Sequence, residues 1–310
     1  MIDHNCNRLP SFFCVGVQKA GTTTFHNWLS RQPDVCLPTI KETHFFSHDD
    51  RFVKGTDWYL SQFEGGRKDS VFGEVDPDYA FYEQAPHRIK KFVPNPKFIF
   101  IFRHPIERAL SHYMMSVRRG FETLSFEEAL LAEEDRCSSR NKHYLSHYSY
   151  LARGRYVEQV SRFQKIFPDA EFFFLKFDDL FNQKTCVATY RNICRFIGLN
   201  STPITPDLTQ KLNPASKSRS KFIQKILYEN SRLKRLTGSI IRSSDTKLKI
   251  ALWLERLNQK SLTKSEISGL EVAFPPEIWE GVKKEILELE KITSLKLKNW
   301  FSKDFLKGPL

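Results

Sequence analysis

The chain has 310 residues, of which 40% are hydrophobic and 14% aromatic, so it can form a large core and is not a disordered protein. Its formal net charge of +12 at pH 7 indicates an anionic partner, and nucleotide, polysaccharide, lipid surface and nucleic acid all satisfy that charge. No stretch is apolar over a bilayer's width and the first residues do not resemble a secretory signal, so we expect a cytoplasmic protein.

The six cysteines include no Cys-x-x-Cys pair, and both Cys14 and Cys194 lie within apolar patterns. Buried cysteines in such patterns are usually reduced, and the spacing matches no known set of zinc ligands. We therefore expect free thiols and no metal site.

The first motif is a strand that runs into a glycine-containing turn and then a helix. Residues 12–17 form a short apolar run typical of a buried strand. Gly16 and Gly21 allow a ligand to approach the backbone closely, with Lys19 between them. Residues 22–24 are threonines that supply hydroxyls and an N-cap to the following helix. The motif predicts an anion site at a helix start.

The order of residues in this turn decides which phosphate compound it suits. A nucleoside-triphosphate loop places its lysine after the second glycine, followed by a hydroxyl residue that holds magnesium. Here Lys19 precedes Gly21. This order disfavours a metal-dependent kinase, which stays as an alternative.

Next in the chain, residues 33–38 indicate a turn and a short edge strand. They lead to Lys41, Glu42 and His44, an amine, a carboxylate and an imidazole within four residues of sequence. An aromatic pair follows directly. A partly desolvated carboxylate beside basic groups is a candidate general base, so we consider Glu42 first and His44 as its rival. A salt bridge in a solvated loop accounts for the same residues equally well.

Two more strands are predicted before the middle of the chain. Residues 71–75 form the first and place Glu74 and Asp76 at its carboxyl end, where ligand-binding groups of parallel sheets lie. Asp76 is also explained as a cap for the segment that follows. Residues 97–102 form the second strand, the most strongly apolar of the chain.

Arg103 stands at the carboxyl end of this second strand, and Pro105 suits the first position of a helix. Ser111 then falls on the second turn of that helix, where a hydroxyl and the guanidinium can bind one phosphate. The helix is predicted to bury one face, comprising Ile106, Ala109, Leu110, Tyr113, Met114 and Val117.

Taken together, these motifs resemble those of the sulfotransferases that use 3′-phosphoadenosine-5′-phosphosulfate (PAPS), in particular the heparan sulfate N- and 3-O-sulfotransferases and their bacterial relatives. The resemblance rests on Val15 to Thr23, Lys41 to Phe46, Gly73 to Tyr79 and Phe102 to Tyr113. Residues 213–221 resemble the basic loop that closes over the cofactor in that family.

The resemblance implies a role for each matching residue. The 5′-phosphosulfate would be held by Lys19, Ala20, Gly21, Thr22 and Thr23. The 3′-phosphate would be bound by Arg103 and Ser111, and the nucleotide would be clamped by Lys217 and Arg219. Glu42 would take the proton of the acceptor hydroxyl or amine, with His44 beside it, and Lys19 would also neutralise the leaving oxygen.

The chemistry agrees with these residue types. Sulfuryl transfer moves SO₃ in line between two oxygens, so catalysis consists mainly of positioning and charge stabilisation. The sulfuryl group carries less negative charge than a terminal phosphate, so lysine and backbone N–H groups suffice and we expect a metal-independent enzyme.

Two positions depart from the heparan-type pattern. That pattern often has a lysine after the Glu74 position and an acidic residue after His-Phe-Phe, and this chain has Val75 and Ser47 there. Both positions serve the saccharide acceptor in that branch, so a heparan-like acceptor is in doubt. Asp49 or Asp50 could substitute for the missing acidic group.

The second half reads as further core and a C-terminal extension. It contains a capped helix from Ser125, a helix over residues 156–167, a strand at 171–176, a helix at about 184–197 and a long helix at 276–297. The helix pattern makes Tyr156 a core residue, whereas the resemblance implies that it lines the site. Residues 221–238 are basic and amphipathic, which fits either a solvated helix pair or contact with an anionic surface.

We therefore predict an α/β fold, a single P-loop-like domain over residues 1–310 with a central parallel sheet flanked by helices. Residues 9–200 would form the core, and 201–310 the cofactor-closing loop and a helical extension. The predicted function is sulfuryl transfer from PAPS to a carbohydrate, lipid or small-metabolite acceptor, with no nucleic-acid partner. The alternatives are a P-loop kinase and a non-catalytic polyanion-binding protein.

Overall fold

The computed structural model describes residues 9–199, 204, 216–218, 259–261 and 276–301. The chain divides into two compact units. The first comprises Met1–Pro105, Arg155–Leu212 and Glu280–Phe301, and the second comprises Ile106–Gly154, Asn213–Trp279 and Ser302–Leu310. The prediction of one domain over the whole chain stays a prediction.

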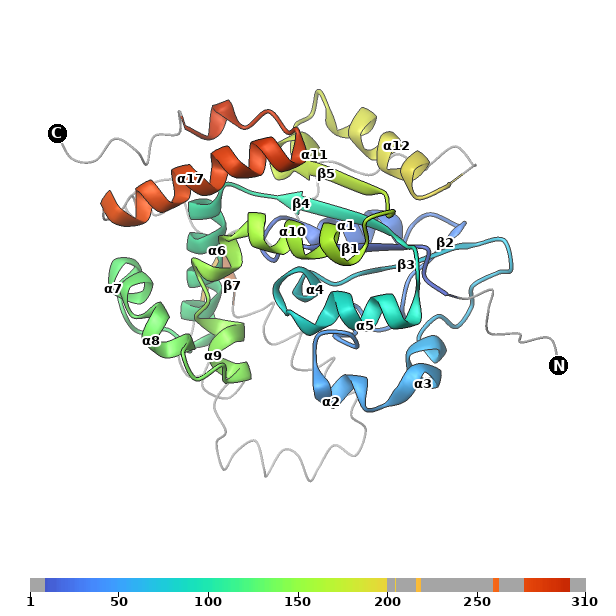
Figure 1. Cartoon of the computed structure of the whole chain (residues 1–310), viewed down its shortest axis with the longest axis horizontal. Helices are drawn as coiled ribbons and strands as arrows, with labels where there is room; N and C mark the ends of the chain where they lie inside the picture. The colour runs from blue at the N-terminus through green and yellow to red at the C-terminus, as the bar shows by residue number, and fades with distance from the viewer. Residues whose placement is uncertain (1–8, 200–203, 205–215, 219–258, 262–275, 302–310) are drawn as a thin grey trace. The chain divides into compact units, whose positions relative to one another are not determined.

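The first unit is built on a five-stranded parallel sheet in the order β2-β3-β1-β4-β5 (Figure 1). Its strands are β1 (Phe12–Gly16), β2 (Val35–Cys36), β3 (Val71–Val75), β4 (Lys97–Phe102) and β5 (Phe172–Lys176). The two-residue β2 is an edge strand, as its position between prolines predicts. The predicted fold class is confirmed, since a central parallel sheet requires helical crossovers between its strands.

Helices cover both faces of this sheet. In the first unit they are α1 (Thr22–Leu29), α2 (Asp49–Phe52), α3 (Gly55–Ser61), α4 (Asp78–Phe81), α5 (Gln84–Phe92), α10 (Tyr156–Ile166), α11 (Phe177–Phe181), α12 (Cys186–Phe196) and most of α17 (Pro276–Thr293), with the short η3 (Lys298–Trp300). Figure 1 shows α4, α5 and α10 grouped on one side of the sheet.

The alternation of side chains along β4 and β5 distributes the aromatic core between the two faces. Phe98 packs edge-on against Phe163 of α10, with ring centroids 5.0 Å apart. Phe173 instead contacts Phe196 of α12 at 5.2 Å. Because successive residues of a strand point to opposite faces, α12 lies on the face opposite α10. α1 packs with α12 through Trp28, whose ring lies 5.7 Å from that of Tyr190.

The second unit contains helices and one pair of strands in its described part. They are α6 (Pro105–Arg119, with Pro105 in the first unit), α7 (Phe126–Leu131), α8 (Glu133–Cys137), α9 (Lys142–His147) and η2 (Ala152–Gly154), together with an antiparallel pair of β6 (Ser216–Ser218) and β7 (Gln259–Ser261). The predicted cap of α7 is confirmed, because Ser125 and Glu128 form a capping box in which each side chain accepts from the other's backbone N–H.

The predicted buried face of α6 is wrong at its C-terminal end. Val117 is 39% exposed, whereas Arg108, His112 and Ser116 are fully buried. These polar side chains are buried because each binds a backbone carbonyl: Arg108 contacts that of Tyr150, His112 that of Ser146 at 3.0 Å and Ser116 that of His147 at 2.7 Å. Hydrogen bonds to a distant segment have rotated the buried face away from the one that hydrophobic spacing predicts.

The long C-terminal helix is confirmed as α17, which ends at Thr293 and buries Val282, Ile286 and Leu289. No helix in the described part of the chain has both the length and the hydrophobicity that a membrane crossing requires. The described cysteines are free thiols, and all except Cys137 are buried. Arg219 and the basic segment 221–238 lie outside the described residues.

Candidate active site

The turn after β1 has the backbone of an anion-binding loop. The Val17 N–H donates to the carbonyl of Ile101 in β4 at 2.9 Å, and the Ala20 N–H donates to that of Val17 at 3.1 Å. Lys19 and Gly21 both adopt the left-handed region, with φ of 73° and 84°. Alternating conformations of this kind point successive N–H groups toward one side, which forms a concave site for an anion.

The start of α1 lacks a side-chain cap. The predicted N-cap among the threonines is wrong, because Gly21 is the N-cap residue and has no side chain to offer. The first turn of α1 also contains no acidic residue. Its N–H groups and the hydroxyl-bearing Thr22 and Thr23 therefore present a positive helix end that an anion can occupy.

Two phenylalanines of α11, Phe177 and Phe181, cover this loop. A Cβ atom added at Gly21 would lie 2.4 Å from Cε2 of Phe181 and 3.1 Å from Cε2 of Phe177. Gly21 is thus required both for its left-handed backbone and for this close approach. The aromatic residues from 172 onward do not indicate, from sequence alone, that α11 packs on the loop after β1.

Arg103 joins the loop to the carboxyl end of β4. Its Nη1 donates to the backbone carbonyl of Lys19 at 3.4 Å, and its guanidinium lies 4.9 Å from the ring centre of Phe177. The hydroxyl of Tyr156 donates to the Arg103 carbonyl at 2.8 Å, so this fully buried tyrosine belongs to the core and also fixes Arg103. Ser111 lies on α6 in the second unit, and its pairing with Arg103 stays a prediction.

The segment with the proposed base is held in an uncommon conformation. Glu42 and His44 both have left-handed backbones, with φ of 58° and 53°. Among the described residues other than glycine, such angles occur at Lys19, Glu42, His44, Arg140 and Ser294, so three of the five are predicted site residues. Residues held in sparsely populated regions cluster at functional sites. Lys41 donates to Glu42 Oε1, and both side chains are 29% exposed.

Two carboxylates at the end of β3 anchor this segment. Glu74 is buried and accepts hydrogen bonds from Thr43 at 2.6 Å, Tyr59 at 2.7 Å and Tyr79 at 3.0 Å. Burial, together with the charge of Asp76, raises the pKa of Glu74 above its usual range. With its oxygens fully engaged by hydroxyls, Glu74 has a structural role.

Asp76 accepts from the backbone N–H groups of His44 at 2.7 Å and Asp78 at 3.0 Å, so it stabilises the start of α4, although Pro77 is the N-cap residue. Its assignment to the site stays a prediction. Its carboxylate lies 3.1 Å from His44 Nδ1. Burial lowers the pKa of His44, but the charges of Asp76 and then Asp78 outweigh it and raise this pKa to about 9. His44 is therefore engaged with carboxylates, whereas Glu42 is the partly exposed carboxylate of the segment.

The two positions that depart from the heparan-type pattern are both buried. Val75 is 1% exposed and Ser47 is fully buried. Neither residue can present a charge to an acceptor. The exposed Asp49 begins α2, where it contacts Arg88.

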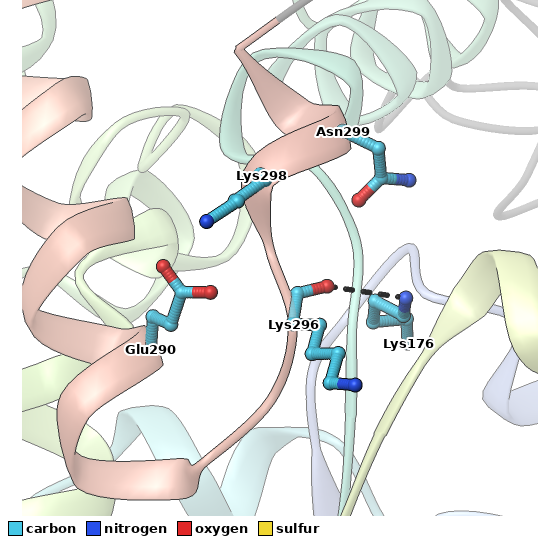
Figure 2. Close-up of a pocket in the computed structure, with 5 residues that line it drawn as sticks. All are labelled: Lys176, Glu290, Lys296, Lys298 and Asn299. Atoms are coloured by element: carbon cyan, nitrogen blue, oxygen red, sulfur yellow. Dashed lines mark hydrogen bonds between the residues drawn. The ribbon is translucent and has the colours of Figure 1, made fainter.

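A hollow lies at the carboxyl end of β5. It has a volume of about 500 Å³ and is lined by Lys176, Glu290, Lys296, Lys298 and Asn299 (Figure 2). Lys176 Nζ donates to the backbone carbonyl of Lys296 at 3.2 Å, which ties the end of β5 to the segment after α17. Lys176 pairs in register with Phe102, the residue before Arg103. The basic hollow therefore lies at the end of β5, the strand next to β4.

The parallel sheet, the glycine loop before α1 and the arginine after β4 define a P-loop-like fold, a class in which phosphorylated ligands bind at the carboxyl ends of the strands. A comparison with known families extends this class. A family model described as the sulfotransferase domain matches residues 9–249. The chain belongs to this sulfotransferase family.

Individual relatives agree with the family. Over 179 residues the chain is 28% identical to heparan sulfate glucosamine 3-O-sulfotransferase 5 of Mus musculus, a match that covers 57% of this chain and 50% of the relative. It is 27% identical over 218 residues to the Homo sapiens bifunctional heparan sulfate N-deacetylase/N-sulfotransferase 2, covering 64% of this chain and 23% of that protein. The chain thus spans half or less of the length of these relatives.

A solved structure is similar over nearly the whole chain. The sulfotransferase from Alicyclobacillus acidocaldarius superimposes with a TM-score of 0.66 and 25% sequence identity, covering 94% of this chain and 99% of that one. The assignment to sulfotransferases made from four short motifs is confirmed at the level of the family and the fold.

Proposed function

We propose that this chain transfers a sulfuryl group from PAPS to a hydroxyl or amine of a carbohydrate acceptor. The observation that carries the proposal is the contact between Arg103 and the carbonyl of Lys19 at 3.4 Å. It sets a guanidinium beside the loop that has the features of a 5′-phosphosulfate site. A nucleotide with phosphates at both ends of its ribose needs two such anion-binding groups close together.

The residues around the loop fit this nucleotide. The left-handed backbones of Lys19 and Gly21 and the uncapped start of α1 suit the 5′-phosphosulfate. The ring of Phe177, already stacked on Arg103, offers a flat surface for the adenine base. Lys217, whose backbone lies in β6 of the second unit, and Arg219 are proposed to close over the nucleotide.

In this proposal PAPS supplies the sulfuryl group, and the protein supplies position and charge. The bond between sulfur and the bridging phosphate oxygen breaks while a bond forms from sulfur to the acceptor oxygen or nitrogen. The carboxylate of Glu42 takes the acceptor proton, and Lys41 orients that carboxylate through their hydrogen bond. Lys19 and the start of α1 stabilise the negative charge left on the phosphate oxygen, a step that needs no metal ion.

The proposed acceptor class rests on the names of the relatives and on the two positions, 75 and 47, at which this chain departs from the heparan-type pattern. The names of the mouse and human relatives specify heparan sulfate, which favours a carbohydrate acceptor. Val75 and Ser47 are buried and uncharged, so this chain lacks two polar groups that the resembling branch directs at its saccharide. We therefore propose a carbohydrate of lower charge than heparan sulfate.

Ligand-dependent melting tests this function against its two alternatives. 3′-Phosphoadenosine-5′-phosphate (PAP) should raise the melting temperature, ADP with magnesium should do so much less, and heparin alone should not reproduce the effect of PAP. Transfer of labelled sulfur from PAPS to a panel of neutral and charged oligosaccharides then identifies the acceptor. Equal stabilisation by PAP and ADP with magnesium would favour the kinase alternative and overturn the proposal.

A further inference from the structure

Three side chains beside the proposed base gather their ligating atoms at one point. The Nδ1 or Nε2 atoms of His44 and His48 and a carboxylate oxygen of Asp78 all lie within 4.8 Å of one another. The His48 N–H donates to the His44 carbonyl at 2.9 Å, a helical turn that places residues four apart on the same side. The two imidazole rings consequently stack, with centroids 4.6 Å apart.

The facing nitrogens have no hydrogen bond. His48 Nε2 is a buried atom without a hydrogen-bond partner, and the whole His48 residue is only 8% exposed. His44 Nδ1 is also buried and does not meet hydrogen-bond geometry, although Asp76 Oδ2 lies 3.1 Å from it. Each nitrogen nevertheless lies 3.5 Å from Asp78 Oδ2. Buried polar atoms that converge without hydrogen bonds are costly, unless a ligand between them satisfies their lone pairs.

The spacing matches the coordination sphere of a transition metal. Ligands at 2.0–2.1 Å from a tetrahedral zinc ion are separated by about 3.3 Å, close to the two distances from Asp78 Oδ2. One ligating atom of each residue lies within 4.8 Å of the other two, and His44 is the most exposed of the three side chains, at 27%. Two imidazoles and one carboxylate form a donor set that suits divalent zinc.

Asp76 binds the backbone of two of the three residues in the cluster. This fully buried carboxylate accepts from the backbone N–H of His44 at 2.7 Å and from that of Asp78 at 3.0 Å, so it fixes both ligand-bearing segments. Supporting carboxylates of this kind orient the ligands of metal sites.

We propose that His44, His48 and Asp78 bind a divalent transition metal ion, with the fourth coordination position open to water. This site is separate from the donor-binding loop, and the sulfuryl transfer does not pass through the metal. The ion holds the strained segment that carries Glu42 against the end of β3. Cysteine spacing and the chemistry of sulfuryl transfer predicted no metal site; the His-x-x-x-His spacing of residues 44 and 48 is the sequence feature that indicates one.

Zinc binding by the tag-free chain tests the proposal without reference to activity. After equilibration with micromolar zinc chloride and dialysis into metal-free buffer, elemental analysis should find about one zinc ion per chain. The variants His48→Gln and Asp78→Asn should weaken zinc binding by about 10- to 100-fold or more. His87→Gln, which alters an exposed histidine outside the cluster, should bind zinc as the parent chain does.

Crystals of the parent chain soaked in zinc chloride give a second readout that does not depend on variants folding. Anomalous scattering at the zinc edge should show a peak between His44, His48 and Asp78. Absence of that peak, or zinc retained equally by the His48→Gln variant and the parent, would overturn the proposal.

Discussion

The hydroxyl of Tyr156, at the first residue of α10, donates to the backbone carbonyl of Arg103, the residue that follows β4, at 2.8 Å. This bond fixes the chain where the strand ends and the arginine side chain begins. Tyr156→Phe should therefore lower the free energy of unfolding by about 1 kcal/mol and also weaken PAP binding several-fold, because Arg103 loses a constraint. Isothermal titration with PAP and urea unfolding measure the two effects.

A matched control is Tyr148→Phe in the second unit, which removes a hydroxyl bonded to the carbonyl of Phe121 at 2.8 Å. It should lose comparable stability and keep its PAP affinity. If both variants bind PAP equally well, Tyr156 does not position Arg103 for the nucleotide.

Replacing Arg103 tests the second anion site directly. Arg103→Ala should weaken PAP binding by about 2–3 kcal/mol, the value of a charge-assisted hydrogen bond to phosphate, in a calorimetric titration. Arg67→Ala removes an arginine that is 56% exposed and pairs with Asp34, and it should leave PAP affinity unchanged. Unchanged affinity in the Arg103 variant would contradict its assignment to the nucleotide.

Gly21→Ala should disrupt the loop for two separable reasons. The left-handed backbone at φ 84° costs about 1–2 kcal/mol for alanine, and the added Cβ meets Phe181 at 2.4 Å, which adds about 1–3 kcal/mol of overpacking. Gly55→Ala has nearly the same φ, 81°, and no atom within 4 Å, so it isolates the backbone cost. Urea unfolding should show the Gly21 variant to be the less stable; equal losses would mean that α11 yields to the methyl group.

Glu42→Gln separates binding from chemistry. The variant keeps the size of the side chain and loses its ability to take a proton, so turnover should fall about 100-fold or more while PAP affinity stays the same. Glu64→Gln, at an exposed glutamate of the same unit, is the control and should retain full turnover. Full activity in the Glu42 variant would transfer the base role to His44.

The lowered pKa of His26 predicts how the free energy of unfolding depends on pH. Burial, and then the charge of Lys41, lower the pKa of His26 to about 4, whereas the unfolded chain has the ordinary value of 6.5. Between these values the unfolded state binds a proton that the folded state does not, so stability falls as the pH decreases from 6.5 toward 4. The loss attributable to His26 should reach about 2 kcal/mol by pH 5.

Urea unfolding of the parent and His26→Gln from pH 7 to pH 5 measures this difference. The gap between the two chains should change by about that amount as the pH falls. Parallel curves would show that His26 does not carry this pH dependence. The exposed His87→Gln variant should follow the parent chain throughout.

Much of the fold followed from local pattern. The segments predicted as strands at residues 12–17, 71–75 and 97–102 all contain strands. In the first and third this follows from a nearly continuous apolar run, which suits a strand covered on both faces. The end of α12 near Gly198 was equally clear, since that glycine takes a left-handed φ of 87°. The prediction of which helix face is buried was less accurate, because Val117, predicted to be buried on α6, is exposed.

The candidate site likewise combines features that local sequence predicts with features that it does not predict. The sequence by itself determined the loop around Lys19, the arginine after β4 and the Glu42 segment, since each depends on neighbouring residues at fixed spacing. Only the tertiary structure decided that Phe177 stacks on Arg103, that Tyr156 binds its carbonyl, and that Asp78 meets two histidines. Such contacts join residues far apart in the chain, and they depend on strand order and helix packing, which the period of a local pattern does not encode.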